Sequence, residues 1–303
     1  MLPAFLAPTH QGGRALSMRR AVVDGARKLG KLRLGPCWGR GKRMTSKVEY
    51  EVAGGVATVR LNDPATLNAL TTEVTDDLHE AARRAGREAR AMKLCGAGRG
   101  FCSGWNLGTT SPGGAGEQFD AGRALENHVN PLMRTLSDLP IPWIAAVHGA
   151  AAGVGASLAL SADLIVAGES AYFLQAFRRI GLVPDGGATW LLAQAAGRVR
   201  AMELMLLGEK LPAAMALAWG LINRVVPDLD VVTAAGALAD ELAAGPTLAL
   251  GLIRRAAWAA TAADFDAALN TERALQTDAG QSEDFREGVA AFFEKRAARF
   301  KGK

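Results

Sequence analysis

The sequence predicts an α/β fold, and three observations lead to this class. Short apolar runs typical of strands alternate with helix-like segments from residue 48 to about residue 197. Two of these runs end in glycine-rich turns, and the segments beyond residue 197 are mostly helical in pattern. With 303 residues, 49% of them hydrophobic, the chain can bury a full core. We therefore predict a basic, disordered leader at 1–46, a core of strand–strand–helix units at 47–197 and a helical region at 198–303.

The individual elements follow from alternation, helix caps and turn residues. Val48 to Val52 and Ala57 to Leu61 alternate on either side of the Gly54-Gly55 turn, as in a β-hairpin. Thr71 or Thr72 can cap the next helix, and later boundaries fall at proline and glycine. In chain order, we expect the hairpin over 48–61, a helix to about 87, a strand at 91–95, a mobile loop at 107–118 and a helix at 121–136 kinked at Pro131. A strand at 143–147, a helix from 153 or 154, strands at 164–167 and 172–173 and a helix to 197 should follow. The remaining elements are helices at 199–208 and 212–220, a strand at 221–226, and helices at 230–244, at 247–260 and after Ser282.

The stretch at 143–163 joins a buried strand to an Ala/Leu-rich helix through Gly149, Gly153 and Gly155. A dinucleotide-binding fingerprint would need a further glycine where Leu158 stands, and a phosphate loop would need a Lys-Ser or Lys-Thr pair, which does not follow. The unpaired N–H groups at the start of the helix can face a small anion or a developing oxyanion. From these residues alone, a tight strand-to-helix crossing without any function explains the glycines equally well.

The positive charge of the chain lies in its leader. Residues 1–43 hold ten Lys/Arg and one acidic residue, whereas the remainder holds 25 basic and 29 acidic residues. The mildly acidic body argues against nucleic-acid binding. We favour an upstream start codon, with Met44 as a second start, or a disordered tail over a targeting peptide, because serine is scarce and no secretory segment with a cleavage site is present. Nucleic-acid binding through the leader ranks third.

The cysteines and histidines show neither a disulfide framework nor a metal site. Cys37, Cys95 and Cys102 form no CxxC motif, and the four histidines lack metal-ligand spacing. We therefore expect a reducing, cytoplasmic location, no bound metal and a hydrogen-bonded structural role for His148. No apolar run approaches the ~20 residues that a membrane span needs, so we expect no membrane association.

Four segments in register resemble the enoyl-CoA hydratase/isomerase, or crotonase, superfamily. They are LNDPATLNAL at 61–70, RGFCSGWNL at 99–107, HGAAAGVGASLALSADLIVA at 148–167 and IGLVPDGGATWLL at 180–192, and the match spans Val48 to Lys303. The resemblance implies a spiral of ββα units followed by C-terminal helices that build a homotrimer, often a hexamer made of two trimers. It also implies an acyl-CoA thioester as substrate, with coenzyme A as part of that substrate and no separate cofactor.

By this resemblance, the thioester carbonyl oxygen accepts two backbone hydrogen bonds, from the N–H groups of Ser103 and Val154. Removal of the proton next to the carbonyl gives an enolate whose charge lies on that oxygen, and two preset donors stabilise it. The resemblance assigns substrate-binding positions to Leu67, Ala69, Gly104, Trp105, Asn106, Leu107, Gly153, Phe177 and Pro184.

Side chains then decide the reaction. Family hydratases carry two glutamates at positions that hold Ser157 and Phe177 here, so the usual route of water addition lacks both groups. Asp185 stands where isomerases of the family have an acidic residue, and one carboxylate can move a proton between two carbons. Burial beside Phe177 and other apolar residues would raise its pKa. Alternatively, Asp185 is a helix cap that accepts the Ala188 N–H, which would lower that pKa; with the resemblance, we favour catalysis.

We therefore predict an acyl-CoA isomerase that acts through a thioester enolate. The alternatives are an enoyl-CoA hydratase, an enzyme like 4-chlorobenzoyl-CoA dehalogenase with Asp185 as nucleophile, and a non-catalytic acyl-CoA or RNA binder. The dehalogenase histidine would fall near Asn130, whereas His128 is two residues away and is expected on another helix face. Asn106 replaces an aspartate of the relatives, and the bulky Trp105 either stacks on the CoA moiety or fills the core.

Overall fold

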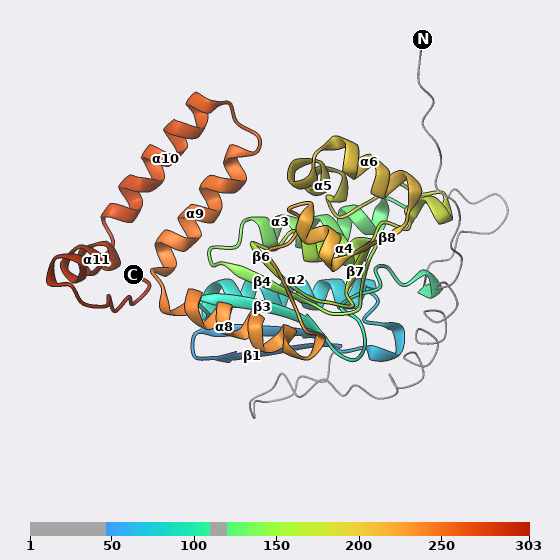
Figure 1. Ribbon diagram of the computed structural model, residues 1–303, viewed down its shortest axis with the longest axis horizontal. Coiled ribbons are helices and arrows are strands. Elements are labelled where there is room, and N and C mark those ends of the chain that lie inside the picture. The colour runs from blue at the N-terminus through green and yellow to red at the C-terminus, as the bar shows by residue number, and fades with distance from the viewer. Residues whose placement is uncertain (1–46, 110–119) are drawn as a thin grey trace, which may run out of the picture. The chain divides into compact units, whose positions relative to one another are not determined.

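The computed structural model describes residues 47–109 and 120–303, which form the α/β fold that the sequence predicts (Figure 1). The predicted leader and most of the predicted loop at 107–118 lie outside the described residues. The strands are β1 (Val48–Ala53), β2 (Val56–Leu61), β3 (Ala91–Gly96), β4 (Trp143–Val147), β5 (Ala150–Ala152), β6 (Leu164–Gly168), β7 (Tyr172–Leu174), β8 (Lys210–Pro212) and β9 (Arg224–Val226).

The helices alternate with these strands up to β9 and then follow one another. The α-helices are α2 (Thr72–Glu88), α3 (Asn130–Ser137), α4 (Val154–Leu160), α5 (Ala188–Ala196), α6 (Arg198–Leu207), α7 (Ala213–Ala218), α8 (Val231–Ala244), α9 (Thr247–Ala260), α10 (Phe265–Gly280) and α11 (Glu283–Glu294). Shorter helical segments are η1 (Pro64–Thr66), η2 (Leu107–Thr109), η3 (Leu125–Val129), η4 (Phe177–Ile180) and η5 (Asp228–Asp230).

Six strands form one sheet in the order β1-β2-β3-β4-β6-β9, in which only the β1–β2 hairpin is antiparallel. Gly54 and Gly55 have φ of +59° and +82°, the left-handed backbone that a two-residue hairpin turn requires. β4 is buried along its whole length, which explains its unbroken apolar run. A second sheet has the order β5-β7-β8, and its strand β5 leads directly into α4.

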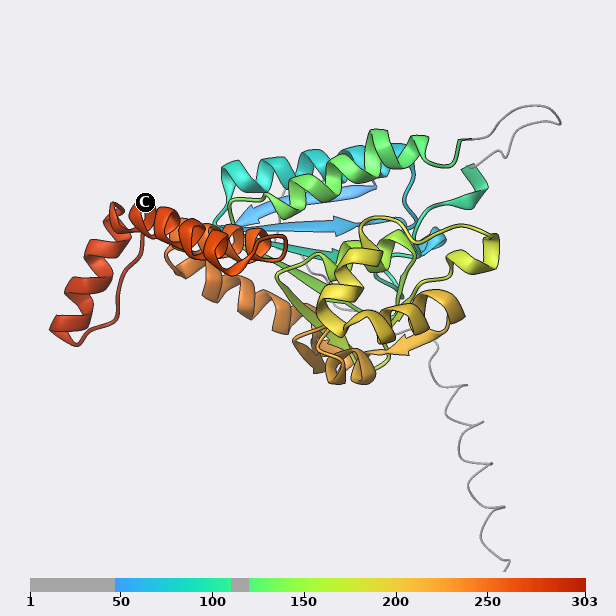
Figure 2. The same cartoon turned by 90° about the horizontal axis from the view of Figure 1, so that it is seen from above.

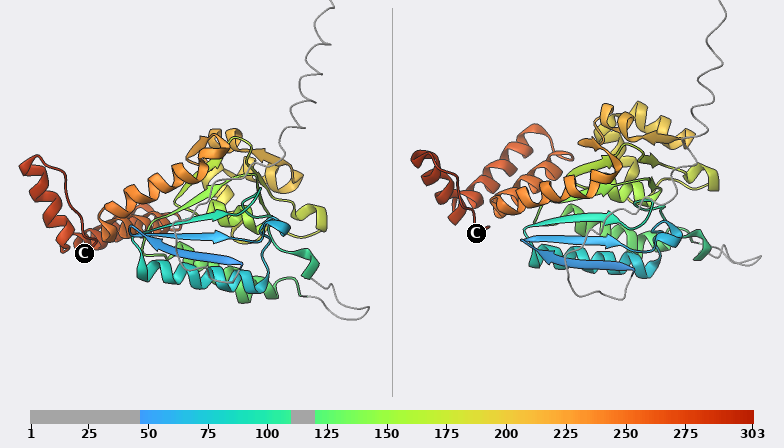
Figure 3. Two further views of the ribbon diagram at one scale, coloured as in Figure 1. Left: turned by 90° about the horizontal axis from the view of Figure 1, so that it is seen from below. Right: turned by 60° about the horizontal axis from the view of Figure 1, so that its bottom comes forward.

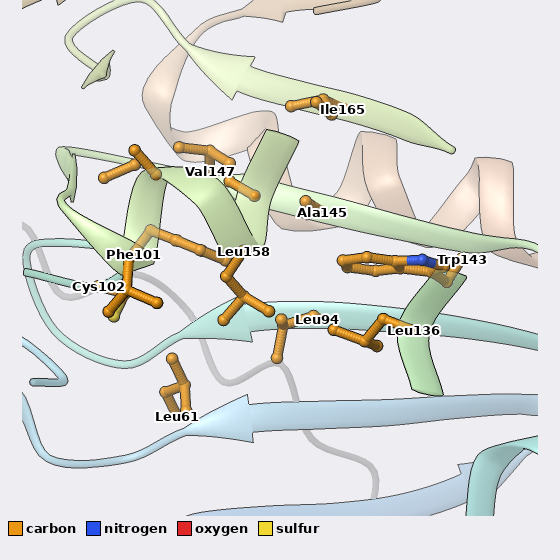
Figure 4. Packing of buried hydrophobic residues seen from close by; sticks show 14 of the residues in the cluster. Leu61, Leu94, Phe101, Cys102, Leu136, Trp143, Ala145, Val147, Leu158 and Ile165 are labelled. Carbon is orange, nitrogen blue, oxygen red and sulfur yellow. The ribbon is translucent and has the colours of Figure 1, made fainter. Parts of the chain in front are cut away.

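Helices cover both faces of the six-stranded sheet. Figure 2 shows α2 and α3 on one side of its strands and α8 on the other, and the views in Figure 3 agree. Small and branched residues such as Ala146, Val166 and Ala235 close the α8 face. The opposite face holds the larger core, in which Phe101 and Leu158 are fully buried (Figure 4). Because Leu158 belongs to α4, the helix after the glycine turn is anchored in this core.

The predicted strands and helices are found in the predicted order, with a few additions. β5 and β8 have three residues each, too few for an alternating pattern to reveal them. The strand expected at 221–226 is confined to β9, and α10 is not among the predicted elements. His148 is buried, and its Nε2–H donates to the Gly98 carbonyl at 3.1 Å, so its predicted structural role is confirmed.

The helix expected at 121–136 contains a π-helical segment, η3, ahead of Pro131. The Asn130 N–H donates to the Leu125 carbonyl, five residues back. Pro131 has no N–H to donate, and its ring would meet the carbonyl of the preceding turn in a regular helix. The wider π turn accommodates the proline and changes which side chains before it face inward.

Residues beyond 197 contribute to the sheets as well as to the C-terminal helices, and the predicted domain boundary there stays a prediction. Strands β8 and β9 complete the two sheets, and α8 covers one of them. α9 is attached to the core by Arg254, which donates to the Asp163 carboxylate and to the Leu136 and Leu139 carbonyls. Exposed aromatic side chains line α10 and α11, namely Phe265, Phe285, Phe292 and Phe293.

Within the described ranges, no single helix is both long and apolar enough to cross a membrane. The segments Asp228–Ala244 and Thr247–Ala260, bent by 109° at the break between them, meet the length and composition criteria only when taken together.

Candidate active site

The two glycine-rich turns of the sequence lie against each other. Gly104 has φ of +92°, and a Cβ there would lie 2.7 Å from the Ala152 carbonyl oxygen. Gly153 has φ of +52°, and a Cβ there would lie 3.9 Å from the Gly104 Cα. Gly104 therefore needs glycine for backbone conformation and for space, and Gly153 needs it for backbone conformation. This close approach brings the first turn of α4 beside the chain that leaves β3.

The N–H of Val154 is available for a ligand. Val154 is the first residue of α4 after the N-cap Gly153, so its N–H has no acceptor within the helix. No hydrogen bond from it to another described residue is found. The backbone geometry therefore allows the role predicted for Val154.

The prediction for Ser103 is wrong, because its N–H is already engaged. It donates to the Leu67 carbonyl at 3.0 Å, and the Ser103 hydroxyl donates to the Thr66 carbonyl at 2.9 Å. Leu67 presents its carbonyl from a left-handed backbone with φ of +56°. Ser103 thus fixes the 61–70 segment to the turn and has no amide proton left for a ligand.

The available amide in this turn belongs to Trp105. Leu70 pairs with the two residues that flank Trp105. The Leu70 N–H donates to the Gly104 carbonyl at 2.7 Å, and the Asn106 N–H donates to the Leu70 carbonyl at 2.8 Å. In such a pairing the intervening N–H points away from the partner strand. No acceptor for the Trp105 N–H is found among the described residues.

Asp185 follows η4 in the turn that leads to α5. The Ala188 N–H donates to the main-chain carbonyl of Asp185 at 3.1 Å, and Gly187 is the N-cap of α5 without a side-chain hydrogen bond. The predicted alternative, in which the Asp185 side chain caps the helix, is therefore wrong. Its carboxyl group is left for another role.

The backbone of Asp185 is held by α4. The Ser157 hydroxyl donates to the Asp185 carbonyl at 2.8 Å. The next residue, Gly186, has φ of +58°, and a Cβ there would lie 2.9 Å from the Ser157 Cβ. A glutamate at position 157, as in family hydratases, would meet this turn. The sequence thus has a small residue where the turn packs closest.

The Asp185 carboxyl group lines a cavity of about 380 Å³. Its Oδ1 is buried and has no hydrogen-bond partner among the described residues. Burial raises the pKa of Asp185 from 3.8 to about 6, and a hydrogen bond from its own backbone N–H opposes the rise. The direction agrees with the prediction. Asp120 also lines the cavity, but it is exposed and accepts the Gly122 N–H at 2.8 Å.

Of the predicted substrate-binding residues, Trp105, Leu107 and Phe177 line the cavity. Trp105 is half-buried, packs against the core and also lines the cavity, so its predicted stacking on the CoA moiety stays a prediction. The Phe177 ring lies beside Gly153, 3.6 Å from where a Cβ would be. The other predicted positions are not in the lining but belong to the turns behind it, namely Leu67, Ala69, Gly104, Asn106, Gly153 and Pro184.

The sequence analysis missed part of the lining. The residues contributed by α2, η3, η4 and the turn after η4 that were not predicted include Thr72, Leu125, Asn127, His128, Ile180 and Leu182. His128 was expected on another helix face and was discounted for that reason. The π-helical turn of η3 shifts the register, so His128 lines the cavity whereas Asn130 does not. Pro131 is the only local signal that could have indicated the shift.

The fold, the paired glycine turns and the cavity carboxylate agree with a comparison with known proteins. The family model described as enoyl-CoA hydratase/isomerase matches residues 51–303. The chain therefore belongs to the enoyl-CoA hydratase/isomerase family, within the crotonase superfamily, and is an enzyme that acts on coenzyme A thioesters.

Three relatives illustrate the range of this similarity. The 1,2-epoxyphenylacetyl-CoA isomerase of Escherichia coli is 46% identical over 254 residues, which cover 83% of this chain and 97% of that protein. A Rhodobacter capsulatus protein named "Probable enoyl-CoA hydratase" is 44% identical over 256 residues, with 84% and 98% covered. The crystal structure of enoyl-CoA hydratase from Bacillus anthracis has a TM-score of 0.79 at 28% identity and covers 85% of this chain and 100% of that chain.

Replacing Ser157 with alanine tests the support that α4 gives to Asp185. We expect the free energy of unfolding to fall by about 1 kcal/mol, the net contribution of one hydrogen bond, and kcat to fall about 5- to 10-fold because the carboxyl group is less well placed. Urea unfolding and steady-state kinetics measure the two effects. Ser161→Ala is the matched control. The Ser161 hydroxyl donates to the Leu158 carbonyl at 2.8 Å, and Ser161 does not line the cavity. Equal kcat in the two variants would show that Ser157 serves stability alone.

Proposed function

We propose that this enzyme is an acyl-CoA isomerase that forms a thioester enolate, with 1,2-epoxyphenylacetyl-CoA or a 3-enoyl-CoA as substrate. The observation that carries the proposal is the Asp185 carboxyl group, which faces the cavity with a buried, unpartnered oxygen and a pKa raised to about 6. A carboxylate with such a pKa is ionised at neutral pH and more basic than an exposed aspartate. It is therefore suited to take a proton from carbon and to return it elsewhere.

The two available amides supply the other half of the chemistry. We assign the oxyanion-binding role to the N–H groups of Val154 and Trp105, which lie on the two turns in contact at Gly104 and Gly153. Both are main-chain donors fixed by the fold, so they need no reorganisation as charge develops on the thioester oxygen. Trp105 and Phe177 provide apolar surface for the acyl group.

Hydration of a 2-enoyl-CoA is the first alternative, and Ser157 and Phe177 argue against it. Ser157 is engaged with the Asp185 carbonyl, and Phe177 has no polar atom in its side chain, so neither can activate a water molecule. Dehalogenation of 4-chlorobenzoyl-CoA by nucleophilic attack of Asp185 is the second. Binding of acyl-CoA or RNA without catalysis is the third, and the free carboxyl group in the cavity argues against it.

Turnover of defined thioesters tests the proposal. We expect the purified protein to convert trans-3-hexenoyl-CoA to the 2-enoyl isomer and to rearrange 1,2-epoxyphenylacetyl-CoA. Hydration of trans-2-hexenoyl-CoA and chloride release from 4-chlorobenzoyl-CoA should both be slower by at least ~100-fold, the typical contribution of a missing acid or base. Tight binding of these thioesters without turnover, or RNA binding that is lost when residues 1–43 are deleted, would refute the isomerase proposal.

We also propose that the enzyme is a homotrimer or a hexamer of two trimers. The support is the set of exposed aromatic side chains on α10 and α11, because Phe265, Phe292 and Phe293 are each at least 76% exposed in the single chain. Sedimentation equilibrium of the full chain should give three or six times 31.7 kDa. Phe292→Asp with Phe293→Asp should shift the distribution to the monomer, whereas a monomeric wild type would refute the assignment.

A further inference from the structure

The cavity has two sides of different polarity. The side that holds Asp185 is apolar and is formed by Trp105, Leu107, Phe177, Ile180 and Leu182. The side formed by α2, η3 and the residues before η3 carries the polar residues Thr72, Asp120, Arg123, Asn127 and His128 beside Ala121, Ala124 and Leu125. Asp120, Arg123 and Asn127 are exposed to solvent, whereas Thr72 and His128 are half-buried. These two side chains can therefore bond a polar atom of a bound acyl group.

His128 is the group on the polar side that can exchange a proton. Its Nδ1 lies 2.7 Å from the Asp76 Oδ1, and its side chain is 25% exposed. An ionised carboxylate only accepts hydrogen bonds, so Nδ1 carries the hydrogen and donates to Asp76. Nε2 makes no hydrogen bond to another described residue. Asp76 thus fixes the ring and leaves Nε2 to gain or lose a proton.

We infer that His128, held by Asp76, is a second acid–base group of this active site and protonates an oxygen on the acyl group of the substrate. The inference rests on the proposed isomerase function and adds to it a residue that only substrates with an epoxide oxygen on the β carbon require. Asp185 works on carbon at the apolar side, and His128 works on oxygen at the polar side. Isomerisation of a plain enoyl-CoA needs only Asp185.

The step balances as follows for a 3,4-epoxyacyl-CoA. The Asp185 carboxylate takes the proton from the α carbon, and the electron pair of that C–H bond forms the enolate. As the enolate returns to the carbonyl form, the double bond forms between the α and β carbons and the C–O bond of the β carbon breaks. The oxygen stays on the γ carbon and takes the proton from His128 Nε2. The product is a 4-hydroxy-2-enoyl-CoA, an isomer of the substrate, and exchange of one proton with water restores both residues.

Several ionisable groups surround His128 and enter any pH profile. Those that face it are Asp76 and Glu73 from α2, Asp120 and Arg123 from the residues before η3, and Asp185 from the other side of the cavity. A variant of His128 therefore has to be compared with wild type on two substrates, and not by its pH profile alone.

The test is His128→Gln on 3,4-epoxyhexanoyl-CoA and on trans-3-hexenoyl-CoA. Glutamine cannot supply a proton, so we expect kcat for the epoxide to fall at least ~10-fold more than kcat for the enoyl thioester, consistent with loss of one acid. His79→Gln is the matched control. His79 also joins two helices, because its Nε2 lies within hydrogen-bond distance, 2.8 Å, of the Thr135 hydroxyl, but it does not line the cavity.

The other outcomes distinguish the two proposals. If His128→Gln lowers both activities equally, or neither, His128 serves structure alone and the inference is wrong while the isomerase function stands. If Asp185→Asn abolishes both activities and His128→Gln only that on the epoxide, both proposals are supported. If wild type turns over neither thioester, the isomerase function is wrong and this inference falls with it.

Discussion

Asp185→Asn should lower kcat for 3-enoyl-CoA isomerisation at least ~100-fold, the lower bound for loss of a positioned general base. Asparagine has nearly the same shape, and the main-chain carbonyl that receives the Ser157 hydroxyl and the Ala188 N–H is retained. The variant loses only the group that can take a proton. Measuring kcat and KM from pH 5 to pH 9 gives the effect, and KM should change little because the apolar surface of the cavity is intact.

The pH dependence of wild type gives the same residue a second signature. The carboxylate form is the base, and burial raises its pKa to about 6, so kcat should rise as pH increases through about 6. Asp185→Asn should lack this rise. Activity in Asp185→Asn equal to that of wild type would mean that Asp185 does not carry the proton.

The same burial predicts the effect of Asp185→Asn on stability and so provides a control for folding. Because the pKa is higher in the folded state than the ordinary 3.8, the folded state binds the proton more tightly than the unfolded chain does. The contribution of Asp185 to stability therefore falls as pH rises from about 4 to about 6, and above about 6 its charge opposes folding. At pH 8 the Asn variant should unfold at the same temperature as wild type or higher, so a loss of activity cannot be attributed to unfolding.

The sequence was sufficient for the parts of the fold that are set by local patterns. The Gly54-Gly55 hairpin, the unbroken apolar run of β4 and the start of α4 at Val154 each follow from residues adjacent in the chain. These features depend on neighbours in sequence, which a pattern can show. The catalytic role of Asp185, in contrast, was predicted only through the resemblance of its segment to the family, because the residues alone favour a helix cap. Burial raises its pKa in the predicted direction.

Which backbone N–H in the turn around residue 103 is available could not be predicted in the same way. Whether an amide in the 102–106 turn is available depends on its pairing with Leu67 and Leu70, more than 30 residues earlier. In this pairing the N–H groups of Ser103 and Asn106 donate to Leu67 and Leu70, whereas the N–H of Trp105 does not donate to either. A shift of one residue along an extended chain reverses the direction of the N–H, so a motif alone cannot identify which amide is available.

His128 illustrates a second limit. A regular helix repeats every 3.6 residues, and on that period His128 and Asn130 point in different directions. The π-helical turn before Pro131 adds a residue to the repeat, which the regular period does not show. The contact between His128 and Asp76 joins two helices 52 residues apart in the chain and is a product of tertiary structure.

Val154→Pro should remove one oxyanion donor and leave the fold intact. Val154 is the first residue of α4, where proline is well tolerated because the N–H has no acceptor in the helix. Loss of one such donor typically lowers kcat ~100- to 1,000-fold, and we expect an effect of this size with either thioester. Steady-state kinetics measure the loss, and circular dichroism with thermal unfolding checks the helix.

Val154→Ala separates the side chain from the amide. The Val154 Cγ2 lies 3.1 Å from the position of a Cβ on Gly186, so proline at 154 also changes the packing beside the Asp185 turn. Alanine makes the same loss of side-chain contact but keeps the N–H, and its kcat should stay near that of wild type. Equal losses in the two variants would assign the effect to packing. A loss that is confined to Val154→Pro and appears in kcat but not in KM would assign the hydrogen bond to the transition state. If the bond were equally strong to substrate and enolate, its removal would raise KM instead.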